Sequence, residues 1–277
     1  MYFLSRIIFS AIFCTDWGMN AILKNVKYFF TLFLLLSSRT LWAADLSFTN
    51  ALAQADVAEK RGDISDALKL YNDAQQAGAN NAVELCVLAR RYCDLTYMTN
   101  STAAQKDWVA DALACSQQAV NADPQNAVAH ASLAVCYAKS CLFADVKTEL
   151  ADSRLFKLEA EKAIALDPRQ DVAYYLLGRW NYGIASAGFF SRAYVKVVYG
   201  GLPKASYQDA VINFKKAVEL APDRILNHAG LALAYEATGE KKLEIAELEK
   251  CCALKPLGPE DIEARRDAQN KLALLQQ

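Results

Sequence analysis

The sequence predicts an all-α solenoid, in which antiparallel pairs of helices stack around one continuous core. The first observation behind this prediction is a recurring motif in which Ala, or Cys in one copy, is followed five residues later by Pro. The second is that apolar residues at helical spacing precede and follow these prolines. Because proline cannot continue a helix, each one marks a turn between two helices. The motif occurs four times, at residues 119–124, 163–168, 217–222 and 251–256.

Residues 1–43 are predicted to be a secretory signal that precedes the fold. Lys24 and Lys27 are followed by the short apolar run 28–36 and then by a small residue at Ala43. A basic region, an apolar run and a small-residue cleavage site together describe a signal peptide. The run 28–36 is short for a helix that spans a bilayer, which favours cleavage over an uncleaved anchor.

This signal sets the expected domain and location. The stretch from Met19 to Ala43 makes a complete signal, so we predict Met19 as the start of the protein. The folded solenoid domain is then expected to cover residues 44–277 and to be exported, either to the periplasm or out of the cell. The alternative is a domain that an uncleaved N-terminal segment anchors to a membrane.

The distances between the prolines locate the repeats. Pro222 and Pro256 are 256 − 222 = 34 residues apart, whereas Pro124 and Pro168 are 44 apart, and Pro168 and Pro222 are 54 apart. We expect the extra residues of the two longer intervals to lie between paired helices, where they lengthen the helices or their connecting loop. The sequence therefore predicts about five helical pairs from Phe48 to Pro256, with lengthened middle repeats.

The apolar runs after the prolines share the same slots. His130 and His228 occupy one slot in two different copies, and Ala134, Gly178 and Ala232 place a small residue in another. Small residues there let two helices approach closely. The pattern of the tetratricopeptide repeat (TPR) is an aromatic residue followed by Leu-Gly, Tyr, Ala-x3-Phe and Pro. The best copy of its second half consists of Ala210, Phe214, Ala217 and Pro222.

Local turn and capping signals complete the predicted elements. Arg61-Gly62-Asp63 and Thr238-Gly239-Glu240 are predicted turns, and Gly78 is the expected cap of the first pair. Thr99-Asn100-Ser101 is predicted to be a loop. Pro259 followed by two acidic residues favours a helix start, so we predict a final helix over Pro259–Leu275 whose charged outer face caps the solenoid.

Three segments resemble one TPR family, the regulator of microtubule dynamics proteins. They are Leu176-Leu177-Gly178-Arg179-Trp180, the stretch 202–207 and the stretch 210–222, and the resemblance extends over roughly Ala127 to Leu275. The long inserts in the middle repeats are similar too. This resemblance implies an association with microtubules. One member is an anchored tether between endoplasmic reticulum and mitochondria whose TPR domain binds phospholipid, which implies a phospholipid or membrane partner as an alternative.

Composition and motifs exclude several classes of function. The net charge of −1 provides no basic field for nucleic acid. The sequence contains no phosphate-binding loop, metal motif or nucleophile elbow, so we predict no catalytic residues, no metal and no cofactor. His130 and His228 share a slot in two repeats, which favours packing over catalysis. The same interpretation holds for most cysteines outside the signal, which are Cys86, Cys93, Cys115, Cys136, Cys141, Cys251 and Cys252.

The segment from Val172 to Gln208 differs from the rest of the chain. It contains nine aromatic residues, four basic residues and no acidic residue. One interpretation is that its aromatic side chains fill the core around longer helices. The other is a groove for an apolar ligand with an anionic head, such as a phospholipid or an acidic amphipathic peptide. The candidate binding residues are Arg179, Trp180, Arg192, Tyr194 and Lys196.

Two functional hypotheses follow from these features. The first is a non-enzymatic TPR scaffold that binds a protein or peptide partner on its concave surface, similar to the regulator of microtubule dynamics proteins. The alternative is a phospholipid-binding or membrane-tethering module that uses the basic aromatic groove around 172–208. An enzyme is the least favoured class, because no convergent cluster of titratable residues is visible.

Overall fold

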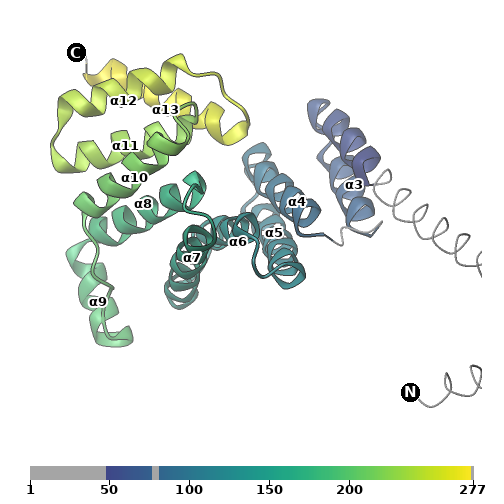
Figure 1. Cartoon of the computed structure of the whole chain (residues 1–277), viewed down its shortest axis with the longest axis horizontal. Helices are drawn as coiled ribbons and strands as arrows, with labels where there is room; N and C mark the ends of the chain where they lie inside the picture. Colours follow the sequence, from purple (N-terminus) through teal and green to yellow (C-terminus); the bar gives the residue numbers. More distant parts are fainter. Residues whose placement is uncertain (1–47, 77–80, 276–277) are drawn as a thin grey trace, which may run out of the picture. The chain divides into compact units, whose positions relative to one another are not determined.

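The structure, a computed structural model, describes residues 48–76 and 81–275, and every regular element in these ranges is a helix. The chain divides into two compact units between residues 78 and 79. The predicted all-α solenoid is therefore confirmed (Figure 1). The predicted signal over 1–43 and the predicted cap at Gly78 lie outside the described residues.

The first unit contains one helical pair. A helix over residues 48–60 is joined to α3 (Ile64–Gln76) by the predicted turn, in which Gly62 has a φ of 76°. Only glycine adopts such a backbone conformation without steric cost. The Tyr71 hydroxyl of α3 hydrogen-bonds to the Glu59 carboxylate, which ties the two helices together.

The second unit contains four further pairs and a terminal helix. The pairs are α4 (Ala82–Leu95) with α5 (Thr102–Ala122), α6 (Ala127–Ser140) with α7 (Val146–Leu166), α8 (Asp171–Ser186) with α10 (Tyr207–Leu220), and α11 (Ile225–Thr238) with α12 (Lys241–Ala253), followed by α13 (Pro259–Leu275). A short 3-10 helix, η1 (Thr96–Met98), follows α4, and an added helix, α9 (Phe189–Tyr199), lies between α8 and α10 in the chain.

Side-chain caps explain where five of these helices begin. Asn81, Ser101, Asn126, Asp145 and Ser206 each precede a helix and accept a hydrogen bond from a backbone N–H of its first turn. These caps satisfy donors that have no partner within the helix. The capping position of Ser101 also confirms the predicted loop at Thr99-Asn100-Ser101, because the backbone there is not helical.

The two long proline intervals have different causes. Between Pro168 and Pro222 the extra residues form α9 and its flanking segments, so they lie between the paired helices as predicted. Between Pro124 and Pro168 the second helix of the pair, α7, is lengthened to 21 residues. The middle repeats are therefore longer than the last one, as the spacing indicates.

Close approach of three helices shapes the core around the α8–α10 pair. The ring of Phe214 in α10 is fully buried against the backbone of Gly178 in α8 and Gly230 in α11. A Cβ atom added at Gly178 would lie 2.7 Å from the Phe214 ring, which is too close for any real contact. The small residue predicted at this slot is thus required by the packing of the ring.

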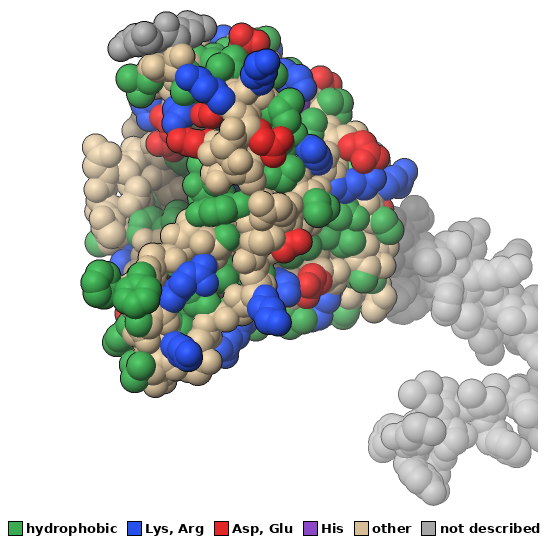
Figure 2. Space-filling view, turned by 90° about the vertical axis from the view of Figure 1, so that its left-hand side faces the viewer, with side chains coloured by type: hydrophobic (Ala, Val, Ile, Leu, Met, Phe, Trp, Pro, Cys, Tyr) green, Lys and Arg blue, Asp and Glu red, His purple; other side chains and the backbone are tan. Residues whose placement is uncertain are grey.

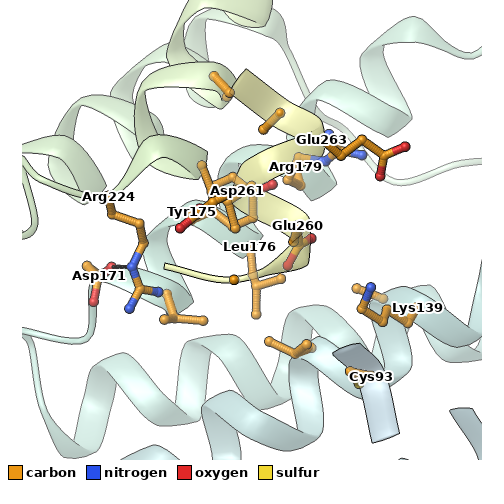
Figure 3. Close-up of a pocket in the computed structure, with 18 of the residues that line it drawn as sticks. Cys93, Lys139, Asp171, Tyr175, Leu176, Arg179, Arg224, Glu260, Asp261 and Glu263 are labelled. Atoms are coloured by element: carbon orange, nitrogen blue, oxygen red, sulfur yellow. Dashed lines mark ion pairs between the residues drawn. The ribbon is translucent and has the colours of Figure 1, made fainter. Parts of the chain in front are cut away.

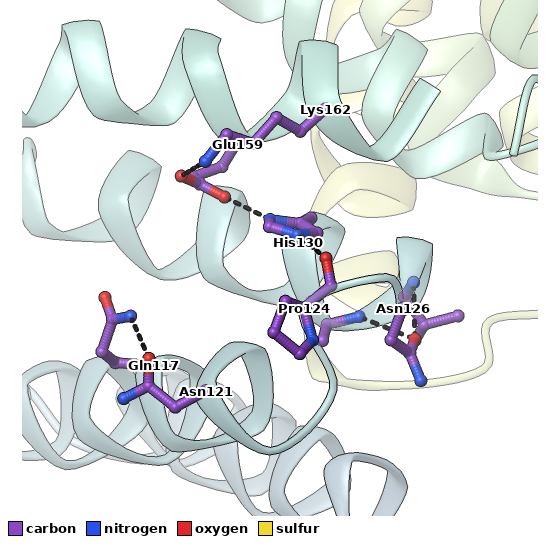
Figure 4. A network of polar contacts seen from close by, with 9 residues as sticks. Gln117, Asn121, Pro124, Asn126, His130, Glu159 and Lys162 are labelled. Carbon is purple, nitrogen blue, oxygen red and sulfur yellow. Dashed lines mark hydrogen bonds and ion pairs between the residues drawn. The ribbon is translucent and has the colours of Figure 1, made fainter. Parts of the chain in front are cut away.

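The two histidines are buried in equivalent networks in two repeats. His130 Nε2 lies 3.0 Å from the Pro124 carbonyl oxygen and Nδ1 lies 2.5 Å from the Glu159 carboxylate, and Lys162 binds the other carboxylate oxygen (Figure 4). The same three contacts recur with His228, which bonds to the Pro222 carbonyl oxygen at 2.7 Å and to Glu247 at 2.5 Å, and with Lys250. Each network links an inter-repeat turn to the following helical pair, so the histidines are packing residues.

Candidate functional site

The first helices of the pairs line a concave groove within residues 81–275. It encloses a cavity of about 1010 Å³, bounded by α4, α6, α8 and α11 and closed on one side by the segment that leads into α13 (Figure 3). This is at the upper end of the size range of small-molecule sites, which is about 300–1,000 Å³. Much of the lining is apolar, including Ala131, Val135, Phe156, Leu176, Ala229 and Leu233.

Basic side chains stand at intervals around this groove. Arg224 forms an ion pair with Asp171 at 3.2 Å between Nε and Oδ2, at the start of α11 and of α8 (Figure 3). On the far side, Lys139 of α6 donates a hydrogen bond to the Tyr97 hydroxyl at 2.9 Å. Arg179 of α8 also lines the cavity. The structure gives it no hydrogen bond or ion pair with another described side chain, so its guanidinium is available to a ligand.

The N-terminal turn of α13 brings acidic groups to the same groove. Glu260, Asp261 and Glu263 all line it, and Figure 3 shows Asp261 beside Tyr175. Burial, and then the charge and hydrogen bond of Glu260, raise the pKa of the Tyr97 phenol, which places Glu260 against η1. Asp261 is buried and accepts a hydrogen bond from the Leu257 backbone N–H. The groove therefore carries both signs of charge on an apolar floor.

Of the five predicted binding residues, only Arg179 lines the cavity. Trp180, its neighbour in α8, points the other way and is 4% exposed in the core. Its indole N–H donates to the Ser153 hydroxyl at 3.1 Å, and Lys157 lies over its ring. Alternation of this kind follows from helix geometry, since consecutive residues point about 100° apart.

The other three predicted residues lie together on α9, away from the cavity. Arg192 donates to the carbonyl oxygens of Ile184, Ala185 and Ala187, and so covers the C-terminal end of α8. Tyr194 and Lys196 are exposed on the same helix. The structure thus divides the segment 172–208 into a packed part, α8, and an exposed part, α9, and does not form one groove from it.

Several groove residues were missed by the sequence analysis. Tyr97, Lys139, Arg224 and Glu260 come from η1, α6, the turn before α11, and α13. Each lies in or beside a helix that faces the concave surface. The available signal was that Lys139 and Arg224 lie in or next to the first helix of a repeat, but it does not reveal which charges face one another across the groove.

The cysteines belong to the packing of the solenoid. Five of the seven in the described residues are buried, as predicted, and Cys93 and Cys136 have their sulfur atoms 4.0 Å apart beside the cavity. Burial raises the pKa of Cys115 and of Cys251 to about 12. Such thiols are protonated at neutral pH and are weak nucleophiles.

Two further features of the described residues concern metal sites and helices that could cross a membrane. Among residues 48–76 and 81–275, no group of three or more His, Cys, Asp or Glu side chains is arranged to hold a metal ion. Within the same described ranges, no helix has both the length and the apolar character needed to cross a membrane.

Comparison with known proteins identifies close resemblance to one family. The family profile described as regulator of microtubule dynamics protein 1-3 matches residues 51–276. The chain is 26% identical to regulator of microtubule dynamics protein 1 of Mus musculus, over 76% of this chain and 73% of the mouse protein. It is 26% identical to protein 2 of Homo sapiens over 76% of this chain and 52% of the human protein. It is 30% identical to protein 3 of Xenopus laevis over 55% of this chain and 32% of that protein, so it spans about half of the human protein and a third of the frog protein.

Solved structures support the fold. A thermophilic TPR protein of Thermus thermophilus superimposes with a TM-score of 0.57 and 18% identity, over 82% of this chain and 99% of that chain. At this level of identity the similarity concerns the fold alone, and it confirms the TPR-like architecture.

Proposed function

The chain belongs to the regulator of microtubule dynamics protein family, and on that premise we propose that it is a non-enzymatic scaffold that binds a peptide segment of a partner protein. The observation that carries this proposal is the concave groove, in which an apolar floor is flanked by the unpaired guanidinium of Arg179. Stacked helical pairs commonly present such a surface to extended or helical segments of a partner. The weak nucleophilicity of the buried thiols is consistent with a binding role.

The groove chemistry defines the expected partner segment. Apolar side chains fill the floor, while a carboxylate of the partner pairs with Arg179, whose planar fork suits two carboxylate oxygens. Glu260 and Asp261 of the α13 turn lie on the same side of the groove as Arg179 (Figure 3) and favour a basic or N–H donor group close to that carboxylate. An apolar segment that carries an acidic and a basic residue close together matches this distribution.

A peptide-display selection on the full chain tests the proposal. Selected peptides are expected to carry this pattern and to bind Arg179→Glu at least about tenfold more weakly, because loss of a charge-assisted bond and a new repulsion each cost about 1–2 kcal/mol. The matched control is Arg169→Glu, since Arg169 has an 86% exposed side chain and does not line the groove. Equal binding to both variants would overturn the assignment of the groove.

We also propose a second candidate function, phospholipid binding in the same cavity. Its volume of about 1010 Å³ and its apolar lining support this candidate, with Arg179 as the contact for an anionic head group. Native mass spectrometry of the full chain, combined with organic extraction, tests it. Co-purified phospholipid that is absent from Arg179→Glu and retained by Arg169→Glu would favour lipid over peptide, and extracts without acyl chains would reject it.

A further inference from the structure

The exposed side chains of α9 form an apolar surface with no partner in the described structure. Phe189, Phe190 and Val197 are 79%, 85% and 85% exposed, although burial of such side chains is strongly favourable. Figure 1 shows α9 standing apart from the stacked helices at the lower left. Exposed apolar patches of this kind mark interaction sites on soluble domains.

The apolar residues occupy one continuous side of the helix. With about 100° between consecutive residues, Phe189, Ala193, Val197, Phe190, Tyr194 and Val198 follow one another around half of its circumference. Val195, on the opposite side, is the buried residue that faces the body of the protein. The apolar arc therefore points outward, which is the reverse of a helix that contributes to a core.

Charge on this part of the chain is of one sign. Between residues 172 and 208 there is no Asp or Glu, and Lys196 is exposed on α9 at the edge of the arc. The guanidinium of Arg192 flanks the arc on the same edge as Lys196 while it binds the carbonyl oxygens at the end of α8. In Figure 2, hydrophobic side chains project at the lower left of the face with basic side chains beside them.

We propose that α9 docks this protein on the surface of an anionic lipid bilayer. An interfacial helix needs an outward apolar face of aromatic and aliphatic residues, with basic side chains at its edge that meet the lipid head groups. The arc itself offers little for polar recognition by a protein, because only the Tyr194 hydroxyl lies on it, whereas hydrocarbon requires no hydrogen bonds. At 1.5 Å per residue, α9 is about 16 Å long and would lie in the plane of the interface.

The solenoid supplies a reason for the orientation of this helix. Gly188 begins α9 and Gly200 ends it in the left-handed conformation, with a φ of 84°. These two glycines delimit a helix that Arg192 ties back to α8. The arc is thus held outward before any contact with lipid, which lowers the entropic cost of docking. This docking surface is distinct from the groove and does not depend on what the groove binds.

Hydrogen exchange of the full chain with vesicles tests the proposal locally. Vesicles of phosphatidylcholine mixed with phosphatidylserine are expected to slow amide exchange in residues 189–199, and vesicles of phosphatidylcholine alone should do so much less. Replacing Phe189, Phe190 and Val197 together by Ser should abolish this protection. Lys196→Gln should weaken binding to the anionic vesicles about fivefold, the factor that corresponds to about 1 kcal/mol per basic residue.

A matched control distinguishes vesicle binding by α9 from nonspecific binding through other exposed apolar side chains. All variants keep the N-terminal apolar segment, so its contribution is the same in each. Val83, Ile212 and Leu274 are each about two-thirds exposed on other helices, and their joint replacement by Ser should leave the protection of α9 unchanged. Two results would overturn the proposal. One is α9 exchange that vesicles do not alter, and the other is protection that rises with protein concentration without vesicles, which would indicate a second copy of the chain on this surface.

Discussion

At the scale of single residues, two features determine how neighbouring repeats pack. The first is the contact of Phe214 with glycine backbones on two neighbouring helices, which sets how closely three helices pack. The second is the repeated network of a histidine, a glutamate and a lysine. Both involve residues at equivalent positions of the repeats, so substitution of these residues tests the packing between repeats.

Substitution of Gly178 is expected to destabilise the protein despite a better helix propensity. The new methyl group of Gly178→Ala would meet the buried Phe214 ring, at a cost of about 1–3 kcal/mol. The control is Gly183→Ala in the same helix, where nothing lies within 4 Å of the added Cβ. That variant gains up to about 1 kcal/mol from helix propensity alone. Chemical denaturation of both variants measures the difference, and equal stability would refute the packing argument.

The network around Glu247 predicts a dependence of stability on acid. Burial acts to raise the pKa of the Glu247 carboxyl, but hydrogen bonds from His228 and Lys250 hold it below its ordinary value of 4.5. A carboxyl whose pKa is lowered in the folded state stabilises the fold above its unfolded pKa, and this contribution is lost as the pH falls through the folded pKa.

Glu247→Gln is therefore expected to cost about 1.5–3 kcal/mol at neutral pH, the range for hydrogen bonds to charged groups. The difference from the natural protein should shrink below pH 4.5. Glu249→Gln, at an exposed position of the same helix, serves as the control. Unfolding curves measured across this pH range provide the readout, and a difference that stays constant with pH would contradict the role of the carboxylate.

At the scale of elements, the two halves of the unusual segment 172–208 illustrate what sequence can predict. Prolines and small residues located the helical pairs because their effects are local. Trp180 of α8 is buried, and Tyr175 and Tyr182 pack partly buried against the core, as one interpretation held. Phe189, Phe190 and Tyr194 of α9 instead point outward. Periodicity identifies an apolar side of a helix but not whether another element covers it, since covering depends on the path of the chain between α8 and α10.

The tie between α9 and α8 leads to a prediction at this scale. Arg192→Ala removes three hydrogen bonds to carbonyl oxygens at the C-terminal end of α8 and a favourable charge at that helix end. We expect faster amide exchange in α9 and in the last turn of α8, with little change elsewhere. Lys196→Ala, an exposed neighbour without such bonds, should leave exchange unaltered in the absence of lipid. Unchanged exchange in Arg192→Ala would mean that the helix is held by other contacts.

At the scale of the whole second unit, α13 completes the stack. Its buried residue Ala268 packs with Ile225, Leu248 and Cys251 of the last pair, while its outer face is charged, as a terminal cap requires. Ala268→Glu is expected to cost about 3–5 kcal/mol, because it leaves an uncompensated buried charge. Ala273→Glu, on the exposed side of the same helix, should be nearly neutral.

Because each repeat packs mainly on its neighbours, the damage should also be graded along the chain. Amide exchange in Ala268→Glu should rise most in α11 and α12 and least in α4 and α5. A uniform rise throughout residues 81–275 would indicate a single cooperative unit instead.

The composition of the groove shows why the site was harder to predict than the fold. Arg179 and Trp180 were both predicted as binding residues of the aromatic and basic segment, but Arg179 lines the groove whereas Trp180 packs in the core. Tyr97 and Glu260 meet although they are separated by most of the second unit. Contacts of this range depend on the accumulated rotation of every repeat between them, and no local pattern contains that information.

The meeting of Glu260 with Tyr97 has a mechanical consequence. A solenoid of stacked repeats behaves as a spring, because small rotations at each repeat add up to large changes in curvature. The proximity of Glu260 to Tyr97 adds one fastening across the groove of the second unit. Straightening residues 81–275 would therefore have to separate these two side chains as well as rotate each repeat against its neighbour.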